Sequence, residues 1–166
     1  MKRVMNIFLI ATAIGFVTSA TAQQQKAANF SLKSANGKSF ELGKYKGKVV
    51  IVNFWATWCG PCRKEIPDFI EVYKKYKNKG LVIIGIALDT AGWSAVTPFI
   101  QESKINYPVV LGDEQVVENY GGVEAIPTTF IVDKNGYIAD QQIGVMSLKE
   151  LETKLIPLLK TPRGKI

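Results

Sequence analysis

The residues Trp58-Cys59-Gly60-Pro61-Cys62 contain the only two cysteines of the chain. They follow an apolar run, Val49–Trp55, and precede residues 63–73, where apolar side chains recur with helical spacing. Two cysteines separated by two residues, at the start of a helix that follows a buried strand, are typical of a redox dithiol. Unpaired N–H groups and the positive end of the helix dipole favour the thiolate of Cys59, so we expect Cys59 to be the more acidic and more exposed sulfur.

Other chemistries of this cysteine pair fit the sequence less well. A structural zinc site usually needs four Cys or His ligands, and a Cys–His nucleophile needs a base, but the chain has no histidine. A purely structural disulfide remains an alternative, although closing so short a loop removes little entropy from the unfolded chain. We therefore expect a redox-active Cys59–Cys62 disulfide, with no metal and no separate cofactor.

The first 22 residues have the features of a cleaved secretory signal peptide. Two basic residues, Lys2 and Arg3, precede an apolar run from Val4 to Val17, and the small residues Ala20-Thr21-Ala22 end it. An uncleaved membrane anchor is the alternative, because residues 4–22 carry no charge and approach the roughly 20 residues of a bilayer span. In either case we expect a periplasmic or otherwise extracytoplasmic protein, in a compartment where disulfides form.

The remaining chain is long enough for one domain. We expect residues 23–29 to be a linker and 30–166 a single domain, because 47% of the chain is apolar and can form a proper core. The formal net charge is +7, of which Lys2 and Arg3 contribute two charges. The lysine clusters lack base-stacking aromatic residues or a known reading motif, which indicates solvated faces rather than a nucleic-acid partner. Nothing suggests an extended dimer surface, so we expect a monomer.

Apolar patterns predict a mixed sheet flanked by helices, an α/β fold. The continuous apolar runs Val49–Trp55 and Leu81–Leu88 predict two buried strands, and the helix between them predicts a right-handed crossover and a parallel pair. Asn36-Gly37, within the alternating segment 30–42, predicts an N-terminal hairpin.

The second half of the chain predicts shorter elements. Residues 93–104 have the pattern of a helix capped by Ser94 or Thr97, and residues 113–120 that of a small helix. A strand after Pro127 and a returning strand that ends at Ile143 predict an antiparallel hairpin. Ser147-Leu148-Lys149-Glu150 is a capping box that opens a last helix.

Two motifs together resemble the thioredoxin-like superfamily, namely residues 52–62 (VNFWATWCGPC) and Ile126-Pro127-Thr128-Thr129-Phe130. The leader, the N-terminal hairpin, the continuation Arg63-Lys64-Glu65-Ile66-Pro67 and the insert between Asp89 and Leu111 are similar to its exported TlpA/ResA-type thiol-disulfide oxidoreductases. The resemblance covers about residues 30–159 and implies a three-layer fold with an insert after the second buried strand.

The resemblance also implies a substrate-binding surface beside the dithiol. Pro127 is expected to be a cis-proline that faces the cysteines, and Ile126 to offer its backbone to an extended substrate segment by strand addition. Trp58 is expected to form an apolar wall next to Cys59. The alternative is that Trp58 and Ile126 are ordinary packing residues that are partly exposed.

One departure from the family concerns the buried acid under the dithiol of cytoplasmic thioredoxins. Asn53 stands at the matching position, and an amide cannot take a proton from Cys62. The exported branch often places an acid after the next strand, which makes Asp89 the candidate for that role. The alternative is that Asp89 only caps the turn that follows it.

The resemblance implies thiol-disulfide exchange with disulfide-containing exported proteins. The Gly-Pro pair between the cysteines is that of thioredoxin, with a potential of about −270 mV, and indicates a reductant that needs a membrane thiol-electron donor. Apocytochrome c is one possible target, and a net oxidant, an isomerase or a non-catalytic redox-regulated binding domain are the alternatives. A peroxidase is disfavoured because Thr57 stands two rather than three positions before Cys59.

Overall fold

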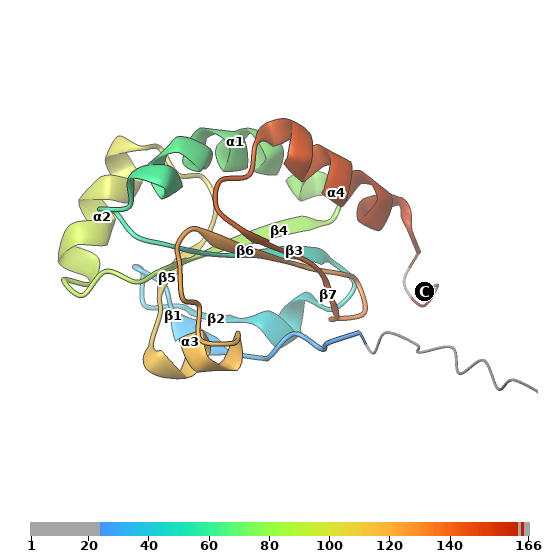
Figure 1. Ribbon diagram of the computed structural model, residues 1–166, viewed down its shortest axis with the longest axis horizontal. Helices are drawn as coiled ribbons and strands as arrows, with labels where there is room; N and C mark the ends of the chain where they lie inside the picture. Colours follow the sequence, from blue (N-terminus) through green and yellow to red (C-terminus); the bar gives the residue numbers. More distant parts are fainter. Residues whose placement is uncertain (1–23, 163, 165–166) are drawn as a thin grey trace, which may run out of the picture.

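The computed structural model describes residues 24–162 and 164, so the predicted signal peptide, residues 1–22, lies outside the described residues. A five-stranded sheet with the order β5-β4-β3-β6-β7 forms the centre (Figure 1). Strands β3, β4 and β5 are parallel, whereas β6 and β7 are antiparallel to their neighbours, which confirms the mixed sheet. The strands are β3 (Val49–Trp55), β4 (Leu81–Ala87), β5 (Val109–Leu111), β6 (Thr128–Val132) and β7 (Ile138–Ile143).

Helices and the N-terminal hairpin cover the two faces of this sheet, which confirms the three-layer fold. Helices α1 and α4 lie over one face, and α3 lies with the hairpin of β1 and β2 on the other (Figure 1). Within residues 24–162, no helix is long and apolar enough to cross a membrane. The bounds are β1 (Ser31–Lys33), β2 (Ser39–Glu41), α1 (Gly60–Tyr76), α2 (Trp93–Glu102), α3 (Glu114–Asn119) and α4 (Leu148–Lys160).

Strand β3 is buried along its whole length because it contributes to both cores of the molecule. Side chains alternate between the faces of a strand, so Ile51 and Trp55 pack under the helices while Val52 and Phe54 pack toward the hairpin. Asn53 has the same parity as Ile51 and therefore points to the helix face. The polar residue of the predicted motif thus lies under α1.

The start of α2 differs from the sequence prediction. The N-cap of α2 is Gly92, and no side chain accepts a hydrogen bond at this helix start. The prediction of Ser94 or Thr97 as the cap is therefore wrong. The turn after β4 brings Gly92 to φ 60°, where glycine is favoured, and starts the helix there. The Ser94 hydroxyl instead donates to the carbonyl of Ala91. The helix ends before Lys104, whose φ of 54° is left-handed.

The capping box at the start of α4 is confirmed. The Glu150 N–H donates to the Ser147 hydroxyl at 3.4 Å, and the Ser147 N–H donates to the Glu150 carboxylate at 2.8 Å. Leu151 and Leu155 then face the core. The cap therefore holds α4 at the position where it covers α1 and β3.

Replacing Ser147 with alanine should lower the free energy of unfolding by about 1 kcal/mol, because one helical N–H loses its partner. Urea unfolding of the oxidised protein measures the change. Thr153→Ala is the matched control, since this exposed hydroxyl of the same helix bonds only the carbonyl of Lys149. An equal loss in both variants would contradict the importance of the cap.

Candidate active site

Cys59 is the N-cap of α1, and its sulfur takes the place of the oxygen of a capping Ser or Asp. The Cys62 N–H donates to Cys59 Sγ at 3.2 Å, and a disulfide joins the two cysteines. Pro61 occupies the first turn, where its missing N–H leaves no helical bond unmade. Cys62 is fully buried and Cys59 is 4% exposed, so the expected order of exposure is observed but the difference is small.

The segment before β6 lies against the cysteines. The Ile126–Pro127 peptide is cis, as the resemblance implied. Cys59 Sγ is 3.7 Å from the carbonyl oxygen of Ile126. Among residues 24–162, no backbone hydrogen bond engages the N–H of Ile126. This edge of the backbone can therefore accept an extended partner.

An apolar rim lies beside Cys59 and consists of the exposed Trp58, Ile143 and Val145 together with the half-buried Ile126. Trp58 is 69% exposed and Ile143 is 63% exposed. The Gly144 N–H donates to the carbonyl of Pro127 at 2.8 Å, which places Ile143 and Val145 beside the proline. Large apolar side chains exposed in one place mark an interaction surface. Sequence reasoning missed Ile143 and Val145 because they follow Pro127 by a whole hairpin.

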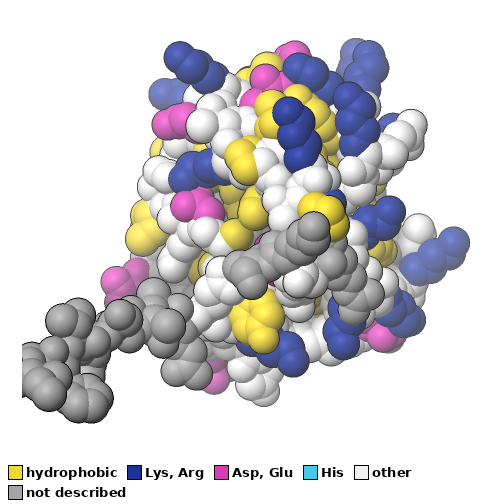
Figure 2. All heavy atoms as spheres, turned by 90° about the vertical axis from the view of Figure 1, so that its right-hand side faces the viewer, with side chains coloured by type: hydrophobic (Ala, Val, Ile, Leu, Met, Phe, Trp, Pro, Cys, Tyr) yellow, Lys and Arg dark blue, Asp and Glu magenta, His cyan; other side chains and the backbone are white. Residues whose placement is uncertain are grey.

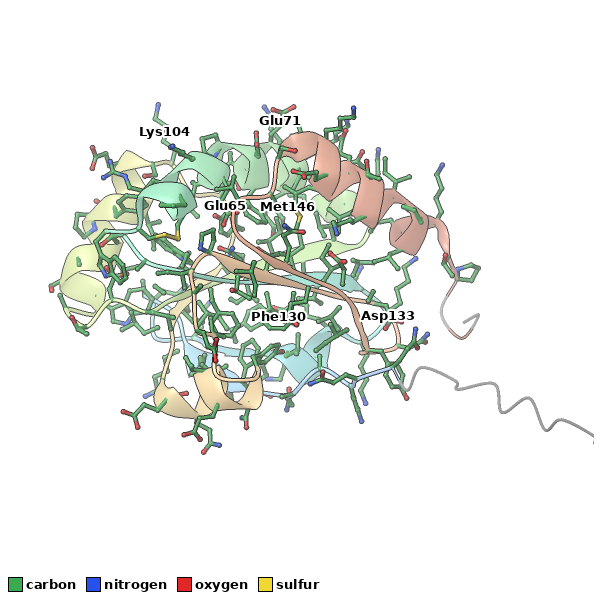
Figure 3. The ribbon with its side chains drawn as sticks, viewed as in Figure 1. Glu65, Glu71, Lys104, Phe130, Asp133 and Met146 are labelled. Carbon is green, nitrogen blue, oxygen red and sulfur yellow. A yellow bond between two sulfur atoms is a disulfide. The ribbon has the colours of Figure 1, made fainter. Side chains whose placement is uncertain are left out.

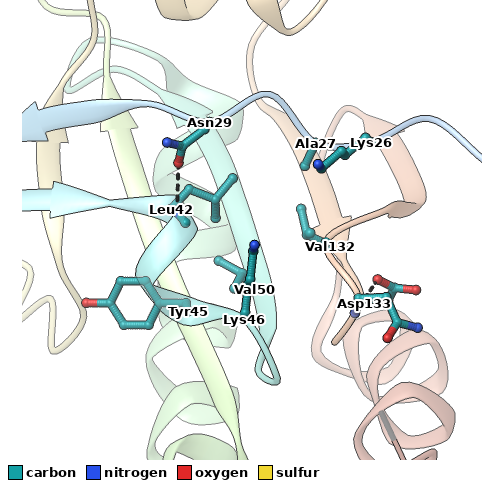
Figure 4. A pocket seen from close by; sticks show the side chains of 12 residues that line it. Lys26, Ala27, Asn29, Leu42, Tyr45, Lys46, Val50, Val132 and Asp133 are labelled. Carbon is teal, nitrogen blue, oxygen red and sulfur yellow. Dashed lines mark hydrogen bonds between the residues drawn. The ribbon is translucent and has the colours of Figure 1, made fainter. Parts of the chain in front are cut away.

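Protein atoms cover both cysteines almost completely, and the open surface beside them is the apolar rim. A hollow of about 220 Å³ lies instead at the other end of β3, between the N-terminal segment and the turn after β6 (Figure 4). Val50 and Val132 form part of its apolar floor, and neither cysteine lines it. An open apolar surface suits a protein substrate better than a small molecule.

The carboxylate of Asp89 binds the loop that precedes the dithiol. Its carboxylate accepts from the backbone N–H of Thr57 at 3.1 and 3.2 Å, and from the Thr57 hydroxyl. The side chain therefore reaches back to the loop before the dithiol instead of capping the turn that follows. This bond holds the Thr57–Trp58 segment next to Cys59.

The acid closest to the dithiol along α1 is Glu65, which the sequence prediction did not select. It lies three residues after Cys62, on the same helix face, and is fully buried. Asn53 Nδ2 donates to Glu65 Oε1 at 2.9 Å and to Thr129 Oγ1 at 3.0 Å. The Met146 N–H donates to Glu65 Oε2 at 3.2 Å. Figure 3 shows Glu65 and Met146 together between the helices and the sheet.

Residues 23–141 match the model of the AhpC/TSA family. The chain belongs to this family of thioredoxin-like proteins. It is 37% identical over 158 residues to the thiol-disulfide oxidoreductase ResA of Bacillus anthracis, covering 90% of this chain and 91% of that protein. It is 38% identical over 133 residues to the thioredoxin-like protein YneN of Bacillus subtilis, covering 79% and 77%.

Solved structures agree with this assignment to the AhpC/TSA family. A thiol:disulfide interchange protein of Chlorobium tepidum superposes with a TM-score of 0.78 at 33% identity, covering 84% of this chain and 99% of that one. StoA of Bacillus subtilis superposes with a TM-score of 0.68 at 28% identity, covering 78% and 97%. With its cysteine pair, this AhpC/TSA protein is a thiol-disulfide oxidoreductase.

Burial raises the pKa of Glu65 to about 7 in this AhpC/TSA protein. The hydrogen bonds from Asn53 and Met146 act in the opposite direction, and the nearby charge of Asp68 adds a small increase. A carboxyl group with this pKa exchanges its proton near neutral pH. The helical spacing from Cys62 could have indicated Glu65, but its burial depends on α4 and the loop at Met146 closing over it.

Replacing Glu65 with glutamine should remove a pH dependence of folding. The unfolded carboxyl releases its proton near pH 4.5 and the folded one near pH 7, so wild-type stability falls as pH rises between these values. The stability of wild type relative to Glu65→Gln should therefore fall by about 3 kcal/mol between pH 4.5 and 8. Urea unfolding of both oxidised proteins across this range measures the difference.

Glu71→Gln is the matched control, because Glu71 is exposed on the same helix. Its stability relative to wild type should stay nearly constant over the same pH range. A constant difference for Glu65→Gln as well would show that Glu65 titrates normally and would contradict this prediction.

Proposed function

We propose that this protein is an exported reductant of protein disulfides, in which Cys59 attacks the substrate and Cys62 resolves the mixed disulfide. The observation that carries the proposal is the sulfur of Cys59 at the N-cap of α1, next to Ile126 and the exposed apolar rim. The N–H of Cys62 and the helix dipole stabilise negative charge on that sulfur. Cys59 is thus prepared to act as a thiolate.

The reaction proceeds in two exchanges that together move two electrons to the substrate. The Cys59 thiolate attacks one sulfur of the substrate disulfide, forming a mixed disulfide, and the other substrate sulfur leaves as a thiolate that takes a proton. Cys62 then loses its proton and attacks Cys59 Sγ. The second substrate thiolate leaves, and the enzyme retains the Cys59–Cys62 disulfide.

Glu65 is the group we assign to the proton of Cys62. Cys62 has no exposed surface, so water cannot easily take its proton when it attacks. Glu65 is one helical turn away, with a pKa of about 7. Asn53, which also donates to the Thr129 hydroxyl, positions the Glu65 carboxyl. Asp89 positions the loop that carries Trp58.

Substrate recognition is expected to be mostly through the main chain. An extended substrate segment adds beside Ile126, with Pro127 behind the scissile disulfide and the apolar rim against its side chains. Such binding tolerates many sequences, which suits a reductase of several exported proteins. Apocytochrome c, with two nearby cysteines, is a target of this chemical class.

The direction of electron flow follows from the potential. The Gly60-Pro61 pair between the cysteines favours a reductant, and a reductant in an oxidising compartment needs a membrane thiol-electron donor. The named relatives support thiol-disulfide chemistry in general. A net oxidant or isomerase would use the same two cysteines with a less negative potential.

Replacing Cys62 with serine should trap the mixed disulfide, because no thiol remains to release the substrate. Incubation of reduced Cys62→Ser protein with an oxidised substrate protein should give a covalent complex on non-reducing gels. Cys59→Ser is the matched control and should give none. Turnover of insulin by Cys62→Ser at the wild-type rate would refute the assigned roles.

The equilibrium potential of the Cys59–Cys62 pair against glutathione or dithiothreitol buffers should lie near the thioredoxin value of about −270 mV. Such a value means that the protein reduces substrates and must be recharged. A value on the oxidising side of about −180 mV would instead identify a disulfide donor.

A further inference from the structure

The loops at the two ends of the central sheet differ in their content of lysine. The loops at the dithiol end contain Asp89, Asp113 and Glu124, and no lysine or arginine occurs in residues 56–59, 88–92, 112–113, 121–127 and 144–147. The loops at the other end, residues 42–48, 77–80 and 133–137, have one acid, Asp133, which is only 4% exposed. Their lysines are Lys44, Lys46, Lys48, Lys77, Lys79 and Lys134.

The strand register brings these lysine-bearing loops together. Val49 of β3 is paired with Leu81 of β4, and the Gly47 N–H donates to the carbonyl of Lys134 at 2.9 Å. Lys134 Nζ in turn donates to the carbonyls of Leu159 and Thr161, which places the end of α4 here as well.

We name this region the basic end. Six of its exposed lysines are Lys26, Lys46, Lys48, Lys77, Lys79 and Lys160, and a seventh, Lys44, pairs with Glu41. Within the described residues, none of the six forms a salt bridge. Figure 2 faces this end and shows basic side chains that project from its rim, with some acidic side chains between them. The positive charge of the basic end is therefore available to a partner.

The chain enters the domain at the same end. The Ala27 N–H donates to the carbonyl of Gly136, and the Ile138 N–H donates to the carbonyl of Gln25. Lys26 is thus fixed at the basic end, only four residues after Ala22, where the apolar leader ends. Four residues span at most about 14 Å. A leader held in a bilayer would keep the basic end close to the lipid surface, at a distance similar to the Debye length of about 10 Å in 0.1 M salt.

We propose that the basic end docks on anionic phospholipid headgroups, with the dithiol at the opposite end facing away from the bilayer. The lysines are spread over the ends of three adjacent strands and of α4, which fits a surface with many anionic groups. They do not converge on the hollow of Figure 4, which includes only Lys26 and Lys46 and also contains the Asp133 carboxyl. A single small anion is therefore the poorer fit.

The test uses the domain that begins at Gln23, because both cores are formed by residues between Ala27 and Leu159 and do not need the leader. Sedimentation with vesicles of equimolar phosphatidylglycerol and phosphatidylcholine should remove the protein from solution at low salt, and molar sodium chloride should release it. Vesicles of phosphatidylcholine alone should not bind it.

Two variants that lose the same number of charges locate the binding surface. Replacing Lys46, Lys48, Lys77 and Lys79 together with glutamine should lower vesicle binding about tenfold or more. The matched control replaces four exposed lysines elsewhere, and it should change binding less than about twofold. These control residues are Lys33, Lys38, Lys64 and Lys149. Unchanged urea midpoints establish that both variants are folded.

The outcomes separate this proposal from the redox function. The Cys59→Ser, Cys62→Ser double variant should bind vesicles as wild type does, since the basic end lies opposite the dithiol. No binding by wild type, or an equal loss in the two lysine variants, would overturn the proposal. Tighter binding to duplex DNA than to anionic vesicles would also overturn it and identify a nucleic-acid partner.

Discussion

The sulfur of Cys59 at the N-cap of α1 is the contact on which the site depends. A helix can present its first N–H groups to this sulfur only if it begins directly after β3, and β3 is held in place because both of its faces are buried. Asp89 anchors the loop between them through Thr57. This helix start holds the cystine in the structure and, in the proposed mechanism, stabilises the thiolate.

The buried carboxyl of Glu65 is the feature of the core that packing alone does not explain. Burying an acid costs free energy unless the carboxyl group stays neutral or is hydrogen-bonded. Both conditions apply to Glu65. Asn53 and the Met146 N–H bind it, yet its pKa remains high because desolvation outweighs these bonds. Glu65 can therefore keep or lose a proton at little free-energy cost, and it lies one helical turn after Cys62.

Sequence patterns predicted what local periodicity determines. The buried strands, the hairpins, the capping box of Ser147 and the parallel pair of β3 and β4 were correct because each depends on neighbouring residues or on burial of a continuous run. The pairing of Glu65 with Asn53, and the position of Ile143 beside Pro127, depend on tertiary contacts between distant segments. The cap of α2 was missed because the turn geometry at Gly92 outweighs the preference for a hydroxyl.

Strand β3 separates the two ends of the molecule by a fixed length. Its seven residues span about 23 Å, with the dithiol following one end and the lysine-bearing loops at the other. A domain resting on its lysines would therefore carry its reactive sulfur at a set height above the lipid. The height of a substrate disulfide above the bilayer would then help to decide whether Cys59 can attack it. A disulfide close to the lipid would lie below Cys59, whereas a disulfide on a domain that projects from the membrane would lie within its reach.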